Sequence, residues 1–117
     1  MIGSPPALQL YSVREQLATG RMPVLRRIAA FGYGAVEPYD VRTDPERLRA
    51  DLDEAGLAVC AVHVEALGED ADVLLRGAQA VGGGTVIVPS VPRERFADAE
   101  GIAALAHELN DAAAKAA

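Results

Sequence analysis

Three glycines at the same point of a repeated pattern constrain the fold of this chain more than any other feature. The segments "AAFGYGAVE", "DEAGLAVCA" and "QAVGGGTVIV" each pass from a helical pattern, through Gly32, Gly56 or Gly82, into a short apolar run. Glycine readily adopts the left-handed backbone that ends many helices. We therefore expect these glycines to cap three helices and to lead directly into strands.

Short apolar runs of strand length alternate with helical patterns along the chain. The runs cover residues 7–12, 34–39, 57–64 and 85–90. The patterns between and after them carry four apolar stripes: Leu25, Ile28 and Ala29; Leu48, Leu52 and Ala55; Leu74, Ala78 and Val81; and Ile102, Leu105, Ala106 and Leu109. A strand, helix, strand order with short loops requires parallel pairing. The sequence predicts an α/β fold of four consecutive βα units, residues 1–117 forming a single domain.

Two arrangements of these units fit the pattern. Four parallel strands can form a small open sheet of the flavodoxin type, with helices on both faces. Four βα units are also half of an eightfold TIM barrel, which typically needs about 250 residues. Periodicity alone does not decide between them.

Composition excludes several classes of partner. The net charge of -6 repels a phosphate backbone, and the arginines are interleaved with acidic residues. No apolar run is long enough to span a membrane, and the first residues lack the features of a signal peptide. The single cysteine, Cys60, lies in an apolar run, where we expect it to be buried. We expect a cytoplasmic protein that binds a small polar ligand, with no nucleic acid and no membrane as partner.

Polar residues gather at the predicted carboxyl ends of the strands, where α/β proteins place their sites. Tyr11, Glu37 and His63 lie at the ends of the first three strands. Each also has a structural interpretation: packing for the tyrosine, solvation for the glutamate, and a hydrogen-bonded structural role for the histidine. There is no P-loop, no GxSxG elbow and no paired-cysteine zinc motif.

Taken together, "ALQLYSVREQL", "VLRRIAAFGYGAVEPY" and "LRADLDEAGLAVCAVHV" resemble the opening of the sugar phosphate isomerase/epimerase family, whose members are xylose isomerase-like TIM barrels. The resemblance runs from the first predicted strand to the fourth predicted helix. It implies the N-terminal half of such a barrel and a sugar or cyclitol substrate. The implied reaction is metal-assisted proton transfer next to a carbonyl. By resemblance His63 contacts a substrate oxygen, Glu37 orients it or shares the polar floor of the pocket, and Tyr11 lines the wall.

The resemblance also implies a divalent metal ion (Mn, Mg, Co or Zn), whose ligands come from later strands of the family's barrel. We therefore expect no metal ligands and no catalytic residues among these 117 residues, and little activity from them alone. A half barrel exposes two strand edges and an inner face. We expect either a fragment of a longer enzyme, or a homo-oligomer or a pair with a complementary half barrel.

Two other functions stay open. One is a non-catalytic half-barrel module for binding or assembly. A minor alternative is a relative of the type IV AP endonucleases, which bind zinc with a third-strand histidine. Acidic charge disfavours DNA as a substrate, and Pro89 and Ser90 stand where a further histidine ligand is needed.

Overall fold

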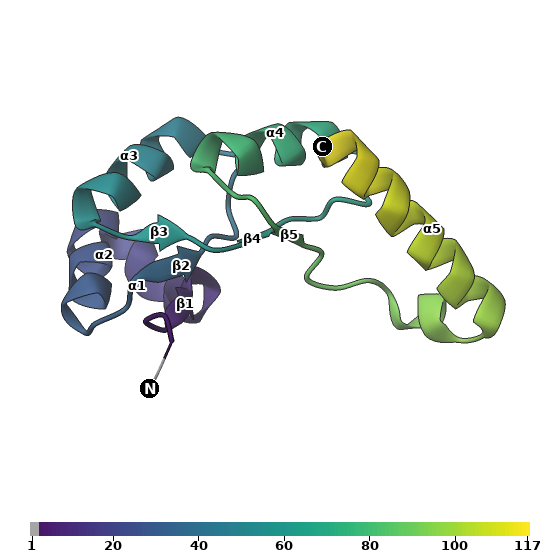
Figure 1. Cartoon of the computed structure of the whole chain (residues 1–117), viewed down its shortest axis with the longest axis horizontal. Coiled ribbons are helices and arrows are strands. Elements are labelled where there is room, and N and C mark those ends of the chain that lie inside the picture. The colour runs from purple at the N-terminus through teal and green to yellow at the C-terminus, as the bar shows by residue number, and fades with distance from the viewer. Residues whose placement is uncertain (1–2) are drawn as a thin grey trace.

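The computed structural model describes residues 3–117 as strands and helices that alternate along the chain (Figure 1). In order, the elements are β1 (Ala7–Gln9), η1 (Leu10–Val13), α1 (Arg14–Thr19), α2 (Arg21–Ala30), β2 (Ala35–Glu37), α3 (Pro45–Ala55), β3 (Ala58–Val59), β4 (Val62–His63), α4 (Ala71–Val81), β5 (Val86–Ile87), η2 (Arg93–Phe96) and α5 (Ala99–Ala116). The four predicted βα units are confirmed. The first strand is shorter than expected because residues 10–13 turn into the helix η1.

Left-handed glycines end the first three long helices, as the sequence predicts. Gly32 follows α2 with a φ of 99°, Gly56 follows α3 at 76°, and Gly82 follows α4 at 94°. The start of α3 is also defined by its residues. The Asp44 carboxylate accepts a hydrogen bond from the Arg47 backbone N–H, and Pro45 occupies the first helical position.

The strands are parallel and lie in the order in which they occur in the sequence. β1 pairs with β2 and β2 with β3, while β4 pairs with β5. Since β1 lies at an edge, the order differs from the flavodoxin type, in which the first strand is internal. The open flavodoxin-like alternative is therefore wrong, and the sequential order is the one found in a barrel.

The third predicted strand, residues 57–64, contains one extra residue that separates β3 from β4. The backbone N–H of Cys60 donates to Val36 O at 3.1 Å, and that of His63 donates to Pro38 O at 2.8 Å. This strand thus advances three residues while its neighbour advances two, which defines a β-bulge. As a consequence Val62, not His63, is buried in the core.

Consecutive helices pack side by side along the sheet. α2 contacts α3, α3 contacts α4, and α4 contacts α5, so the helices form an arc around the outside of the strands (Figure 1). The core lies between these two layers. Its most completely buried large side chains are Leu25, Leu52, Val36, Val41, Val62 and Val81.

The concave face of the sheet is open. The radius of gyration is 15.7 Å, whereas a compact domain of this length has a value of about 13 Å. Ala7, Gln9, Ala58 and Cys60 are all exposed. The expected burial of Cys60 is therefore wrong, because its side chain points to the open face and not into the helix layer.

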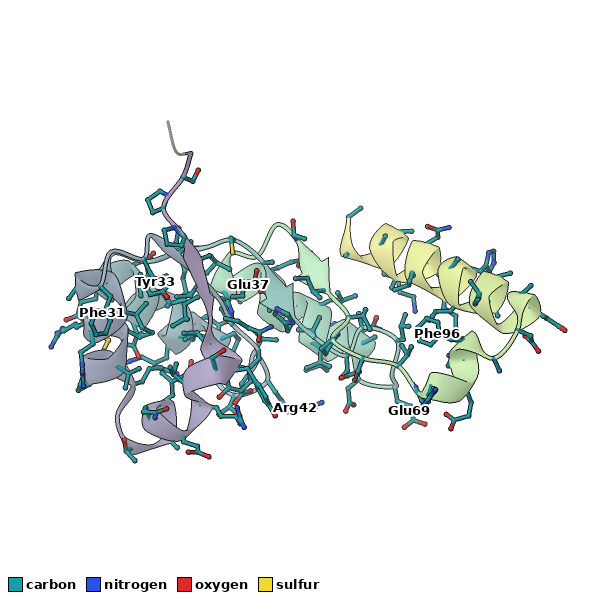
Figure 2. The ribbon with its side chains drawn as sticks, turned by 90° about the horizontal axis from the view of Figure 1, so that it is seen from below. Phe31, Tyr33, Glu37, Arg42, Glu69 and Phe96 are labelled. Carbon is teal, nitrogen blue, oxygen red and sulfur yellow. The ribbon has the colours of Figure 1, made fainter. Side chains whose placement is uncertain are left out.

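The last helix packs less closely than its apolar stripe predicts. Leu105 is buried, but Ile102 and Leu109 are 50% and 40% exposed, and Phe96 just before the helix is 54% exposed. Figure 2 shows Phe96 at the opposite end of the molecule from Phe31, which follows α2. Within residues 3–117, no helix is both long and apolar enough to cross a membrane.

A buried carboxylate ties α3 to α2. Asp51 is 5% exposed, and its oxygens lie 2.6 Å from the Arg21 guanidinium and 3.1 Å from that of Arg47. Burial opposes ionisation, but the two arginines outweigh it and hold the pKa of Asp51 below its usual value. The carboxylate is therefore a charged structural link between two helices.

Candidate functional site

Three polar side chains meet at the carboxyl ends of the first three strands. Gln9 of β1 lies directly opposite Glu37 of β2 in the parallel register. His63 of β4 contacts both, because the bulge turns it toward the open face, on which Glu37 also lies. The His63 side chain is 12% exposed and that of Glu37 27%, so the pair is largely shielded from water.

One ring nitrogen of His63 makes both contacts. Its Nε2 lies 2.7 Å from Glu37 Oε2 and 3.1 Å from Gln9 Nε2. A single ring nitrogen cannot donate to the carboxylate and accept from the amide at the same time. The shorter contact favours an Nε2–H that donates to Glu37, with the Gln9 amide turned to bring its oxygen to the ring. That tautomer leaves Nδ1 free to accept a hydrogen bond from a ligand.

Cys60 lies on the other side of the Glu37 carboxylate. Its Sγ is 3.7 Å from Glu37 Oε1 and 3.6 Å from the Val36 carbonyl oxygen. Desolvation by the neighbouring strands, and then the negative charge of Glu37, raise the pKa of the Cys60 thiol. The thiol is thus held in its protonated form and is not an activated nucleophile.

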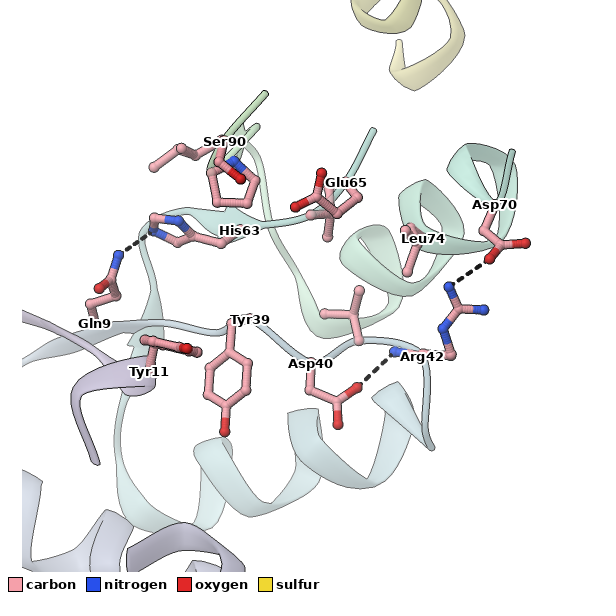
Figure 3. Close-up of a pocket in the computed structure, with 14 residues that line it drawn as sticks. Gln9, Tyr11, Tyr39, Asp40, Arg42, His63, Glu65, Asp70, Leu74 and Ser90 are labelled. Atoms are coloured by element: carbon pink, nitrogen blue, oxygen red, sulfur yellow. Dashed lines mark hydrogen bonds and ion pairs between the residues drawn. The ribbon is translucent and has the colours of Figure 1, made fainter. Parts of the chain in front are cut away.

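An open hollow of about 920 Å³ lies beside this cluster (Figure 3). It is lined by Gln9, Tyr11, Tyr39, Asp40, Val41, Arg42, His63, Val64, Glu65, Asp70, Leu74, Ile87, Pro89 and Ser90. Its size suits a small ligand. The hollow combines an apolar floor with polar groups from all four βα units.

The two sides of the hollow differ in chemistry. On one side the Tyr11 and Tyr39 rings meet edge to face, with 5.4 Å between their centroids. On the other, the Arg42 guanidinium lies 2.9 Å from Asp70 Oδ2, and the Arg42 backbone N–H donates to Asp40. One side of the hollow is therefore aromatic, and the other carries an ion pair.

The structure brings two of the predicted site residues into direct contact and places the third nearby. Tyr11 and His63 line the hollow, whereas Glu37 does not line it and contacts His63 behind it. Sequence reasoning missed Gln9. Its signal was available, since Gln9 precedes Tyr11 by two residues within the predicted strand 7–12, where alternation would place both on the same side.

The described residues do not fit a metal ion. Within residues 3–117, no three His, Cys, Asp or Glu side chains are grouped closely enough to hold one. Glu37 and His63 form a pair whose facing atoms already satisfy each other. We therefore assign no step of chemistry to a metal at this cluster.

Comparison with solved structures finds chains of similar fold. The chain aligns with a sugar phosphate isomerase/epimerase from Parabacteroides distasonis ATCC 8503, with a TM-score of 0.73 and 20% sequence identity. The alignment covers 99% of this chain and 49% of that one, so this chain spans about half the length of its structural neighbour. No family model and no curated protein matches the sequence. The likeness shows the fold, an α/β arrangement that matches half of a TIM-barrel-like enzyme.

Proposed function

We propose that this chain is the sugar-binding half of an isomerase/epimerase-type barrel. The observation that carries the proposal is the His63–Glu37 pair at the rim of a hollow of ligand size, with an Nε2 to Oε2 distance of 2.7 Å. The structural neighbour is a sugar phosphate isomerase/epimerase, which supports the same class of substrate.

In this proposal His63 binds a substrate oxygen, and Glu37 positions the imidazole. With Nε2–H donated to Glu37, the free Nδ1 accepts a hydrogen bond from a sugar hydroxyl. The protonated ring would instead donate from Nδ1 to a carbonyl oxygen. Tyr11 and Tyr39 provide an aromatic wall for the apolar face of a ring. Gln9 helps to hold the histidine in place.

The proposal assigns binding, not turnover, to these residues. Proton transfer next to a carbonyl needs an acid/base pair, and a divalent metal ion would stabilise the charge that develops on oxygen. We propose that these groups are supplied by residues outside this chain. The cluster alone contains one carboxylate and one imidazole, and these two groups are hydrogen-bonded to each other.

Ligand binding at His63 can be followed directly, because the chain has only two histidines. The ring signals of His63 and His107 are recorded by NMR while a panel of ketoses and ketose phosphates is added. We expect the His63 signals to shift with saturation and those of His107, which lies exposed on α5, to stay fixed. If no sugar shifts the His63 signals, or both histidines shift together, the proposed site is wrong.

Matched variants separate the site from general effects on the protein. His63→Ala should abolish binding of the sugar identified in the titration, whereas His107→Ala should leave its affinity unchanged. Glu37→Gln should weaken binding while the fold persists, because the imidazole loses its charged partner. Assaying the same samples for isomerisation distinguishes a binding half from a complete enzyme.

A further inference from the structure

Within residues 3–117, the strand arrangement has two unpaired edges, one at each end of the arc of helices. β1 forms one edge of the strand arrangement and β5 the other, and both belong to parallel ladders. The carbonyl oxygens of Thr85 and Ile87 accept from β4, so the alternate residues Val86 and Val88 direct their backbone groups to the open side. An unpaired parallel edge can accept another parallel strand.

We propose that a second copy of this chain closes the barrel, with β5 of each copy pairing with β1 of the other. When a two-fold axis relates the two copies, the β5 edge of each copy pairs with the β1 edge of the other. No strand edge is then left unpaired. The result has the eight parallel strands and outer helix ring of a TIM barrel. This inference is independent of the proposed function, because a barrel of two copies would hold two sugar sites but not the acid/base groups that the proposed function assigns to residues outside this chain.

Charge at the two ends favours pairing of unlike ends. Residues 14–30, which form α1 and α2, carry four arginines and one glutamate. Residues 99–116, which form α5, carry three acidic residues and one lysine. In a closed ring the last helix of one copy lies beside the first helices of the other. Opposite net charges therefore meet at both seams.

Four charged side chains of these helices have no ion-pair partner within residues 3–117. Arg14 and Arg27 belong to α1 and α2, and Glu100 and Asp111 belong to α5. Arg14 contacts the Tyr11 ring and carbonyl oxygen, so its contacts in the single chain are not to an acid. Across a seam, these arginines would find acidic residues of the other copy.

Apolar surface at the α5 end is exposed in the single chain. Ile102 and Leu109 lie on the helix, and Phe96 just before it, all at least 40% exposed. Large apolar side chains gathered at one end of a fold mark an interface. In the closed dimer these residues would be covered, and the exposed Cys60 would lie inside the barrel.

Two measurements on the 117-residue chain test the proposal. Sedimentation velocity over a range of concentrations should show a species of twice the 12.2 kDa chain mass. The rate at which iodoacetamide modifies Cys60 should fall as that species forms, because closure covers the concave face. A chain that stays monomeric at all concentrations overturns the proposal. So does a dimer in which Cys60 reacts as fast as in the monomer, because that dimer uses another face.

A charge-reversal pair tests the seam itself. Asp111→Lys places a cation against the arginine-rich end of the partner, and should raise the dimer dissociation constant roughly fivefold or more. Glu46→Lys makes the same change at an exposed position of α3, in the middle of the arc, and should leave the constant within about twofold. Equal effects of the two variants would refute the assignment of the seam. Circular dichroism verifies that both variants are folded.

Discussion

The buried carboxylate of Asp51 allows a controlled test of what holds α2 and α3 together. Asp51→Asn keeps the shape of the side chain and removes the charge that two arginines share. Hydrogen bonds between charged groups contribute about 1.5–3 kcal/mol each. Arg21 and Arg47 are 35% and 69% exposed, so water can solvate them once the carboxylate is gone. The amide oxygen of an asparagine can still accept from one arginine. We therefore expect the loss of one such contribution, about 2 kcal/mol in the free energy of unfolding.

Asp53→Asn is the matched control. It makes the same change two residues later in the same helix, where Asp53 is 61% exposed and pairs with Arg49, which is 47% exposed. An exposed pair of this spacing contributes about 0.3–0.5 kcal/mol. Urea denaturation followed by circular dichroism, at one fixed protein concentration, gives both values. Equal losses for the two variants would refute the argument that burial makes the Asp51 pairs stronger.

The pH dependence of the stability of Asp51→Asn tests whether the ionised form of Asp51 stabilises the folded chain. The pKa of Asp51 is lowered from its ordinary 3.8 in the folded chain. Its contribution to stability is therefore complete above that value and disappears as the pH falls through the folded pKa. Below pH 3.8, stability should fall less steeply in Asp51→Asn than in the unaltered chain. An unchanged slope would show that folding does not lower the pKa of Asp51.

Three further outcomes follow from packing and exposure. Gly77→Ala should lower the free energy of unfolding by about 1–3 kcal/mol, because a Cβ there would overlap the Val41 carbonyl oxygen, and urea denaturation measures it. Leu52→Ala should cost about 2–5 kcal/mol, as Leu52 is fully buried, whereas Leu109→Ala, at 40% exposure, should cost under about 1 kcal/mol in the monomer. In dilute monomer at pH 8, the Cys60 thiol should react with iodoacetamide more slowly than glutathione does, because its pKa is raised.

Each of these expectations can fail in a specific way. A stable Gly77→Ala would mean that α4 can move away from the loop before α3. Equal losses at the two leucines would mean that the α5 end is already covered under the conditions used. A fast-reacting cysteine would mean that the carboxylate beside it does not disfavour the thiolate.

The helix ends and the alternation of strands and helices could be predicted because they depend on residues close together in the sequence. The glycines after α2, α3 and α4 and the Asp44–Pro45 cap act within a few residues, so their effects can be read from the chain. The order of the strands could not be read in this way, because both a flavodoxin-like sheet and a half barrel bury the same apolar runs. Only the position of β1 at an edge decided between them.

The candidate site was less predictable because it depends on the face of the sheet to which each side chain points. Tyr11, Glu37 and His63 were identified from their places at strand ends, but the contact between Glu37 and His63 depends on the bulge. The same open face explains the error at Cys60. An apolar run predicts burial only where both sides of the sheet are covered, and here the concave side is not.

The extra residue between β3 and β4 has an evolutionary consequence. Deleting Ala61 would leave Cys60 and His63 two residues apart, so regular alternation would keep the imidazole on the open face. Straightening the bulge with Ala61 still present would instead turn the imidazole toward the helices and bring Val62 to the open face. Residues 60–63 should therefore tolerate the loss of one residue better than a one-residue shift of register.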